Sequence, residues 1–154
     1  MALSVDIRKA LGNFHLAVQF DAGDETLALL GASGCGKSVT LKCIAGILTP
    51  DEGHIELDGV TLYDSASRIN LPPQRRQVGY LFQQYALFPW LTVEKNVQFG
   101  LKLQGKSNEE AEEIARKYLK MVDLEGFAKA YPKELSGGMK QRVAIARAYA
   151  VNPK

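Results

Sequence analysis

The sequence is poor in the residue types that mark several common classes of small protein. Its 154 residues include only two cysteines, two histidines and one tryptophan. Cys35 and Cys43 form no metal or redox motif, so we expect a reducing compartment rather than a disulfide framework. No apolar run approaches the length of a membrane span, and no basic start followed by an apolar core opens the chain. These absences predict a soluble, cytosolic protein.

An excess of charge of one sign is also missing. The chain has 19 Lys and Arg against 17 Asp and Glu, which gives a net charge of +2, and the two signs are interspersed. So small and dispersed a charge does not favour a nucleic-acid partner. The 46% hydrophobic and 23% charged residues are typical of a globular protein, and the length suits one domain with a real core.

What the sequence does contain is a glycine-rich motif between two apolar segments. Residues 31–38, Gly-Ala-Ser-Gly-Cys-Gly-Lys-Ser, match the phosphate-binding pattern of Gly, four free positions, Gly, Lys and Ser or Thr. Thr26–Leu30 before it has the composition of a buried parallel strand, and Ser38–Leu48 after it has apolar residues at helical spacing. Glycines let successive N–H groups point at phosphate oxygens beside the positive end of the helix. The motif therefore predicts a nucleotide site, the alternative being a glycine-rich turn that merely precedes a helix.

Two side chains of this loop have predicted chemical roles. Lys37 would reach the β- and γ-phosphates of ATP, and the Ser38 hydroxyl would bind Mg²⁺. Cys35 is expected to be a reactive thiol that ATP shields, because it lies at a helix start beside a lysine; the alternative is a small residue merely tolerated there. The other residues expected to contact the nucleotide are Gly31, Ser33, Gly34, Gly36 and Val39.

The remainder of the first half predicts strands. Alternating apolar and polar residues indicate two β-hairpins, Leu3–Leu11 with Phe14–Phe20 and His54–Leu57 with Val60–Leu62. Asp64–Arg76 is polar and contains a proline pair, which predicts a surface connection. Val78–Phe82 has the composition of a buried strand that ends at Gln83.

From residue 84 onward the pattern changes to helices. Thr92 is predicted to cap a helix that extends to Leu103. Ser107 and Glu110 have the spacing of a capping box. The helix that this box opens has an apolar stripe composed of Ala111, Ile114, Ala115, Tyr118, Leu119 and Val122. A last helix is expected at Met139–Val151.

Two further motifs narrow the class of nucleotide-binding protein. Residues 135–142, Leu-Ser-Gly-Gly-Met-Lys-Gln-Arg, and the pair Phe82-Gln83 resemble the signature sequence and the Q-loop of the ATP-binding cassette (ABC) family. The resemblance extends from about Leu3 to the last residue. It implies an α/β fold of the P-loop NTPase class, with a RecA-like core, an antiparallel β-subdomain and a helical subdomain, incomplete at the C-terminus. The implied regions of this one incomplete domain are a strand-rich core (1–83), a mainly helical subdomain (84–136) and the signature helix (137–154).

The signature residues have a physical interpretation of their own. Ser136 can cap its helix, and Gly137 and Gly138 expose N–H groups at the positive end, which makes a second anion site. The resemblance implies a homodimer in which two copies pack head-to-tail and each signature covers ATP held by its partner's loop. The alternative is that these three residues only form a good helix cap.

The resemblance also assigns roles to Gln83 and to aromatic residues. Gln83, with Lys37, would be catalytic, contacting Mg²⁺ and the attacking water; otherwise it is a polar residue at a strand end. In family importers the segment matching Tyr85–Leu91 forms a groove for a cytoplasmic helix of the membrane subunit, although Phe88 and Trp90 could instead be core residues. Phe14 would stack on adenine, or would be buried in its hairpin.

The sequence ends before the family's next motif, a strand ending in Asp-Glu followed by a His. The Walker B Asp, the catalytic Glu and the switch His therefore have no matching positions here. We expect a chain of these 154 residues alone to bind ATP weakly, to hydrolyse it negligibly and to self-associate.

Residues 71–89 resemble the importer branch of the family, and the start of the chain is similar to molybdate and tungstate transporters. This implies an ATPase subunit that powers import of an oxyanion such as molybdate or sulfate. It would lie on the cytoplasmic face of the membrane, bound to permease subunits and linked through them to an extracytoplasmic solute-binding protein. The alternatives are a soluble ABC ATPase acting on nucleic acid or ribosomes, and a truncated, non-catalytic nucleotide-binding module.

Overall fold

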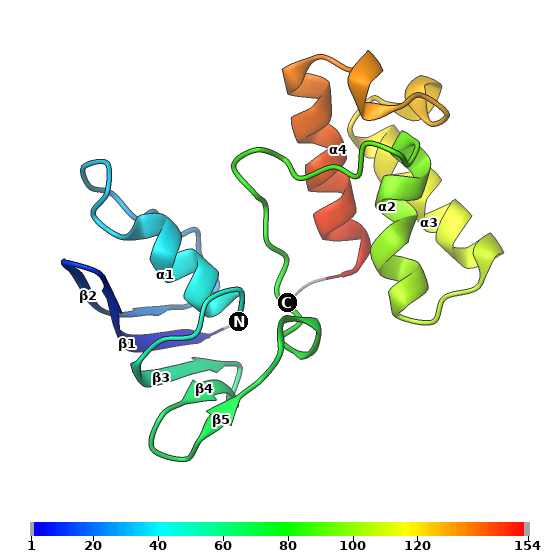
Figure 1. The fold of residues 1–154 in the computed structure, drawn as a ribbon. Helices are drawn as coiled ribbons and strands as arrows, with labels where there is room; N and C mark the ends of the chain where they lie inside the picture. The colour runs from blue at the N-terminus through cyan, green and yellow to red at the C-terminus, as the bar shows by residue number, and fades with distance from the viewer. Residues whose placement is uncertain (1, 153–154) are drawn as a thin grey trace. The chain divides into compact units, whose positions relative to one another are not determined.

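The computed structural model describes residues 2–152 and divides the chain into two compact units. The first unit, Met1–Val78, contains a β-sheet and one α-helix, and the second, Gly79–Lys154, is helical (Figure 1). Each unit has its own hydrophobic core, so each is described separately. The boundary between the two units lies at Val78–Gly79, and the predicted division of the domain at residue 83 stays a prediction.

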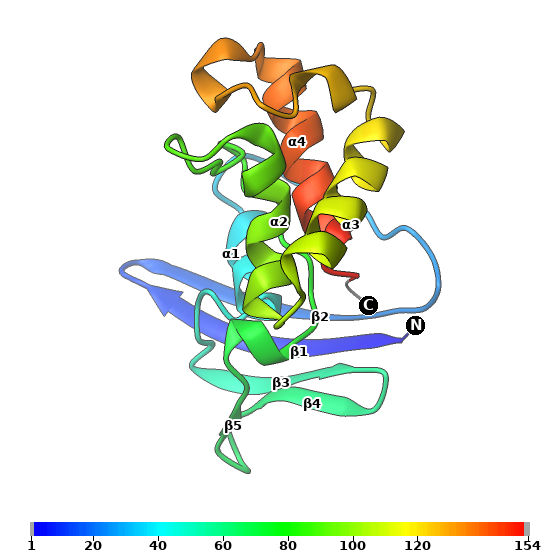
Figure 2. The ribbon, with the colours of Figure 1, turned by 90° about the vertical axis from the view of Figure 1, so that its right-hand side faces the viewer.

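The first unit is built on an antiparallel sheet with the strand order β2-β1-β3-β4-β5 (Figure 2). The strands are β1 (Leu3–Leu11), β2 (Phe14–Ala22), β3 (Glu52–Leu57), β4 (Val60–Asp64) and β5 (Ile69–Asn70). Both predicted hairpins are confirmed. Leu11 pairs with Phe14 across the first turn, and Leu57 pairs with Val60 across the second. In the second turn Asp58 and Gly59 both have positive φ, as a two-residue hairpin turn of this kind requires.

Helix α1 (Lys37–Ile44) packs on one face of this sheet (Figure 2). Its buried residues Cys43 and Ile44 join the core formed by Val5, Ile7, Ile55, Leu57, Leu62 and Tyr63. The helix is shorter than the predicted Ser38–Leu48. It ends because Gly46 adopts a left-handed conformation (φ 76°), which stops a right-handed helix.

Two predicted strands, Thr26–Leu30 and Val78–Phe82, are not present in the structure. Neither segment has strand conformation, and Leu30 and Phe82 are 91% and 39% exposed. Their apolar composition predicts burial, but a strand also needs a neighbour that accepts and donates its backbone hydrogen bonds. Within residues 2–152, strands pair only with other strands of the five-stranded sheet. Neither of these two segments therefore has a strand beside it to pair with.

The second unit contains helices α2 (Val93–Leu103), α3 (Asn108–Met121) and α4 (Gly137–Ala150). The predicted caps are confirmed for the first two. The Thr92 hydroxyl accepts from the Lys95 N–H at 3.3 Å, and Ser107 and Glu110 form a complete capping box. Helix α4 begins two residues earlier than predicted. Two single 3₁₀ turns, η2 (Glu125–Phe127) and η3 (Pro132–Glu134), lie between α3 and α4.

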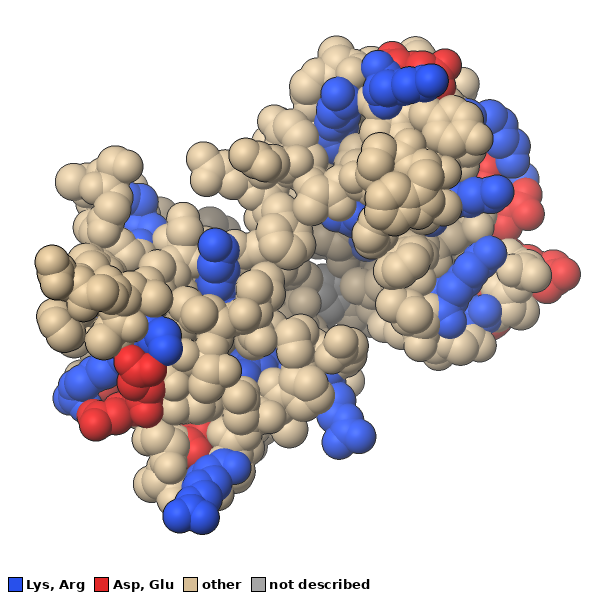
Figure 3. Space-filling model, in the orientation of Figure 1, with Lys and Arg blue, Asp and Glu red and all other residues tan. Residues whose placement is uncertain are grey.

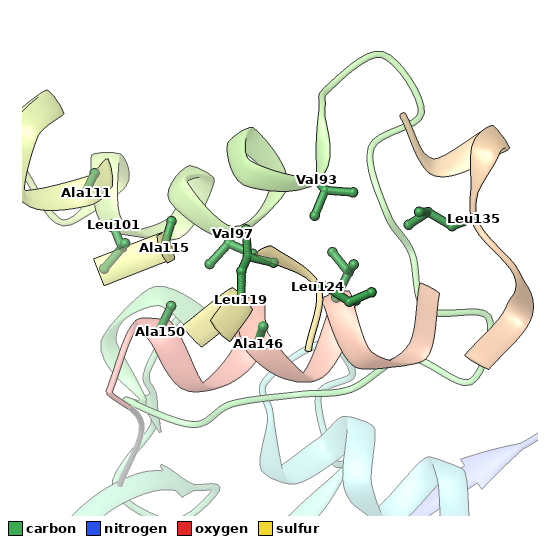
Figure 4. Close-up of a cluster of buried hydrophobic side chains, with 11 residues drawn as sticks. Val93, Val97, Leu101, Ala111, Ala115, Leu119, Leu124, Leu135, Ala146 and Ala150 are labelled. Carbon is green, nitrogen blue, oxygen red and sulfur yellow. The ribbon is translucent and has the colours of Figure 1, made fainter. Parts of the chain in front are cut away.

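The core of the helical unit lies where the three helices meet, as Figure 4 shows. The apolar stripe predicted for α3 is confirmed, because Ala111, Ala115 and Leu119 are buried there. They face apolar side chains of the neighbouring helices, Val93, Val97, Leu101, Val143, Ala146 and Ala150. Small alanines on α3 and α4 allow the helices to approach closely, and the buried residues of α4 begin at Val143.

Within residues 2–152, no helix combines the length and the apolar character needed to cross a bilayer. On the face drawn in Figure 3, basic and acidic side chains are scattered over both units without forming a continuous patch of either sign.

Candidate nucleotide site

The glycine-rich loop enters α1 through a tightly packed glycine. Gly36 is the N-cap of α1 and has a φ of 98°. A Cβ atom at this position would lie 2.6 Å from Leu16 Cδ1 and 3.1 Å from Phe14 Cζ, both on β2. Only glycine meets both the backbone and the steric requirement. Because Gly36 has no side chain, no side-chain oxygen caps the first-turn N–H groups of α1.

Lys37 folds back over the loop that precedes it. Its Nζ donates hydrogen bonds to the carbonyl oxygens of Gly31 and Ala32, both at 2.7 Å, and lies 3.5 Å from Cys35 Sγ. The ammonium group is thereby fixed at the N-terminal end of α1, where the helix dipole is also positive. Two sources of positive potential act at one place, which suits an anionic ligand.

The remaining loop residues differ in what their side chains can offer. Ser33, Gly34, Cys35 and Ser38 are exposed. Val39 is partly buried and packs against the sheet core. Thr40, which no sequence motif indicated, is buried and its hydroxyl donates to the Gly36 carbonyl at 3.0 Å. Thr40 thus fixes the end of the loop from the first turn of the helix.

The structure brings Phe14 to this loop. Phe14 is half-buried at the start of β2, and its ring lies against Gly36. It therefore lies beside the phosphate loop, which is compatible with both of its predicted roles. Cys35 and Cys43 are free thiols, the first exposed and the second buried, and burial raises the pKa of the Cys43 thiol.

The C-terminal end of α1 is held by an arginine that the sequence analysis placed in a surface connection. That prediction is wrong for Arg76, which is only 1% exposed. Its Nη1 donates to the carbonyls of Cys43 and Ile44 at 2.8 and 2.9 Å. Its Nε and Nη2 donate to the Leu71 carbonyl and to Asn70 Oδ1 at 2.7 and 2.8 Å. Its four hydrogen bonds replace part of the hydration that burial removes from the guanidinium, and this role left no local pattern in the sequence.

The second glycine-rich helix start lies in the helical unit. The Ser136 hydroxyl accepts from the Met139 N–H at 3.3 Å and caps α4. Ser136, Gly137 and Gly138 are all exposed. A Cβ at either glycine would meet no other described atom within 4 Å. The folding of the described unit therefore does not require glycine at these two positions.

Gln83 is an exposed turn residue in the helical unit, and the chain after it has an unusual backbone. Tyr85 and Ala86 have φ values of 60° and 43°, a left-handed conformation that non-glycine residues seldom adopt. Arg147 of α4 holds both residues, donating to the Ala86 and Tyr85 carbonyls at 2.8 and 3.0 Å. Burial lowers the pKa of Arg147. Sequence reasoning missed Arg147, although a cation within the apolar run 143–150 was an available signal.

A buried asparagine fixes the backbone of the segment that carries the aromatic residues after Tyr85. Asn96 donates to the carbonyls of Phe88, Leu91 and Thr92 and accepts from the Phe88 N–H at 2.8 Å. Phe88 is half-buried against Phe99, with ring centroids 4.5 Å apart. Trp90 is 70% exposed, so it is not a core residue of this unit.

Comparison with known proteins places these features in one family. The sequence model described as "ABC transporter" matches residues 15–154. The chain is 43% identical over 152 residues to a molybdenum import ATP-binding protein of Paramagnetospirillum magneticum, covering 99% of this chain and 41% of that protein. It is 48% identical over 144 residues to a spermidine/putrescine import ATP-binding protein of Lawsonia intracellularis, covering 94% of this chain and 37% of that protein. The chain thus spans about two fifths of the length of these two relatives.

A solved structure shares the fold. The ATP-binding cassette MJ0796, in a dimeric post-hydrolysis state bound to ADP and Pi, superposes with a TM-score of 0.81 at 34% identity. The match covers 99% of this chain and 71% of that one. It confirms the predicted fold class, an α/β P-loop fold with an antiparallel β-subdomain and a helical subdomain. With the family model matched over residues 15–154 and the fold shared with a solved cassette, the chain belongs to the ABC transporter family.

Proposed function

We propose that this chain forms the nucleotide-binding part of an ATP-hydrolysing subunit that powers a binding-protein-dependent importer. The observation that carries the proposal is the start of α1. There the first-turn N–H groups have no side-chain cap, and the Lys37 ammonium is held against the loop that precedes the helix. Catalysis of phosphoryl transfer needs positive groups that are already in place before the substrate binds, because the protein contributes mainly by positioning the reacting groups and by stabilising negative charge.

ATP is the proposed ligand of this loop. The residues proposed to contact it are Gly31, Ser33, Gly34, Cys35, Gly36, Lys37, Ser38 and Val39, with Phe14 against the adenine. The donor set fits a polyphosphate, since N–H groups and an ammonium can donate to its oxygens and the loop itself offers no carboxylate to repel it. The placement of Phe14 beside Gly36 supports its inclusion.

Mg²⁺ is the proposed metal, with the Ser38 hydroxyl as a ligand. Among the described residues, no group of three or more His, Cys, Asp or Glu side chains could hold a metal ion. Mg²⁺ does not need such a cage, because it keeps several waters and binds substrate phosphates through a few protein oxygens. For Gln83, contact with Mg²⁺ and with the attacking water stays a prediction.

A head-to-tail homodimer is proposed to complete the site, with Ser136, Gly137 and Gly138 covering ATP held by the partner's loop. The support is that both glycines are exposed and that a Cβ at either would meet no described atom within 4 Å, so the fold of the unit does not explain them. The solved relative is described as dimeric and bound to ADP and Pi. In the complete protein the dimer would lie on the cytoplasmic face of the membrane, bound to permease subunits. The exposed Trp90 beside Phe88 is the proposed contact with the permease.

The cargo is proposed to be an oxyanion such as molybdate or sulfate, reaching the permease from an extracytoplasmic solute-binding protein. The relative from P. magneticum is a molybdenum importer subunit. The relative from L. intracellularis is named for polyamines, so identity in this region does not by itself determine cargo.

Reconstitution of the complete transporter in vesicles tests the proposal. We expect uptake of labelled molybdate or sulfate to require ATP and Mg²⁺ on the side that carries this subunit. A non-hydrolysable ATP analogue should not support uptake. Uptake of putrescine under the same conditions would contradict the cargo. Uptake that is independent of nucleotide would contradict the function itself.

A further inference from the structure

Arg76 is a charged side chain buried among neutral groups. Its exposure is 1%, and among the ion pairs of residues 2–152 it has no carboxylate partner. An ionised group taken out of water without a counter-ion is costly, and arginine does not lose its proton in proteins. Something in its surroundings must therefore compensate for the charge.

The compensation comes from the end of α1. Nη1 donates to the carbonyls of Cys43 and Ile44, the last two carbonyls of the helix, and the Cys43 carbonyl also accepts from the Gly46 N–H at 3.1 Å. This is also the negative end of the helix dipole, so the cation is favoured there. Gly46 lets the guanidinium approach, because a Cβ on Gly46 would lie 2.6 Å from Arg76 Nε.

The same guanidinium is fixed on its other side by the segment between β4 and the end of the unit. Nε bonds the Leu71 carbonyl and Nη2 bonds Asn70 Oδ1. The residue after Arg76, Gln77, has a φ of 54°, so the chain turns sharply there. Arg76 thus joins the end of α1 to the segment around Asn70 and Leu71. It lies two residues before the first unit ends at Val78.

Helix α1 is short, and its other end carries the phosphate loop. Its eight residues begin with Lys37 and end with Ile44, so they span only about 12 Å. A helix of two turns moves as a rigid body, so a shift of its last carbonyls displaces its first N–H groups. Lys37 and these N–H groups act by position, and small displacements weaken such contacts strongly.

We propose that Arg76 is a positioning residue of the nucleotide site, which holds the phosphate-loop helix in place from its C-terminal end. The inference rests on the proposed binding of ATP at this loop. Arg76 itself does not touch the nucleotide and acts only through α1.

Equilibrium titration of the complete protein with Mg-ATP tests the proposal. The variants are Arg76→Met, Arg76→Lys and, as a matched control, Arg75→Met, which changes the exposed neighbour in the same 3₁₀ turn, η1 (Pro73–Arg75). We expect Kd to rise about tenfold for Arg76→Met, because the helix start is displaced. Arg76→Lys should fall between this and the wild type, since it keeps the charge but not the forked geometry. Arg75→Met should match the wild type.

The titration separates positioning from folding. Kd is a property of the folded molecules and does not change when part of a sample is unfolded and inert. Unchanged Kd values for folded Arg76→Met or Arg76→Lys would overturn the proposal. If Arg76→Met does not fold, Arg76→Lys alone decides between the two outcomes. If neither the wild type nor Arg75→Met binds Mg-ATP, the proposed function fails instead.

Discussion

The two glycine-rich helix starts of this chain look alike in sequence but differ in what makes glycine necessary. At the start of α1, Gly36 has a left-handed backbone and is packed against Leu16 and Phe14. At the start of α4, Gly137 and Gly138 are helical and face open space. The first glycine is required by the fold of its own unit. The second pair costs helix stability and serves no packing purpose within the described unit, which points to a ligand or partner from outside it.

The two helices also differ in how their N-terminal ends are capped. Ser136 caps α4 with its hydroxyl, whereas α1 has no side-chain cap. Instead, Lys37 turns back over the loop. In the proposed function, the start of α1 holds an anion beside the fixed Lys37, and the open start of α4 covers one from the partner. Three predictions test this contrast, and a fourth compares the acid stability of the two units.

Replacing Lys37 should have the largest effect. Lys37→Ala removes the ammonium that is fixed over the loop, and we expect ATP hydrolysis by the complete protein to fall by roughly 100-fold or more. Lys42→Ala, an exposed lysine of the same helix, is the control and should retain activity. Steady-state ATPase assays measure both. A Lys37→Ala variant with wild-type activity would remove the distinction between the two helix starts.

Replacing Gly36 should destabilise the first unit. Gly36→Ala forces a Cβ into Leu16 and imposes a left-handed backbone on alanine, at a cost of about 1–3 kcal/mol. Gly34→Ala separates the cost of the steric clash from the cost of the left-handed backbone. Gly34 also has positive φ, but a Cβ there would meet no described atom within 4 Å. Urea unfolding should therefore show the larger loss for Gly36→Ala. Equal losses would mean that packing against β2 is unimportant.

Replacing Gly137 should do the opposite, sparing the fold and damaging function. An acidic residue in the first turn is favoured by the helix dipole, so Gly137→Asp should raise the unfolding free energy by about 0.3–1 kcal/mol. The same carboxylate would repel a phosphate, and we expect ATPase activity to fall at least tenfold. Gly137→Asn is the neutral control. If Gly137→Asp unfolds the protein or leaves activity intact, the open glycines do not mark an anion site.

Acid sensitivity gives the smallest effect and compares the two units directly. The Ala10 N–H and Lys9 lower the pKa of Asp51 in the first unit, and the Ser107 N–H and Lys106 lower the pKa of Glu110 in the second. A carboxyl with a lowered folded pKa contributes stability above its unfolded pKa, and that contribution is lost as the pH falls through the folded pKa. Unfolding measured at decreasing pH should show a weaker pH dependence for Asp51→Asn and, independently, for Glu110→Gln. A pH dependence that neither variant changes would contradict these assignments.

Features that depend on residues close together in the sequence could be predicted, and features that depend on distant residues could not. The hairpin at Asp58-Gly59 and the capping box at Ser107 are determined by residues a few positions apart, and both were predicted correctly. The segments 26–30 and 78–82 were predicted as strands and are not, because strand formation depends on a distant neighbour that composition does not reveal.

The candidate site divides in the same way. The phosphate loop follows from a contiguous motif, whereas the hydrogen bonds of Lys37 to the Gly31 and Ala32 carbonyls were not predicted, and its contact with phosphate stays a prediction. Arg76 and Arg147 were missed because each bonds backbone carbonyls that lie more than 30 residues away in the sequence and that only the tertiary structure brings near. Asn96 could have been found, since it is a polar residue on the apolar face of α2 beside Val93 and Val97.

Mixing two inactive variants of the complete protein tests the central claim most directly. Lys37→Ala spoils the loop, and Gly137→Asp spoils the helix start proposed to cover the partner's ATP. In a head-to-tail dimer of one subunit of each kind, the intact loop of one faces the intact helix start of the other. Such a mixture should recover roughly a quarter of the wild-type ATPase rate, because half of the dimers then carry one complete site. A mixture as inactive as its two components would show that loop and helix start act within one chain, and would contradict the account.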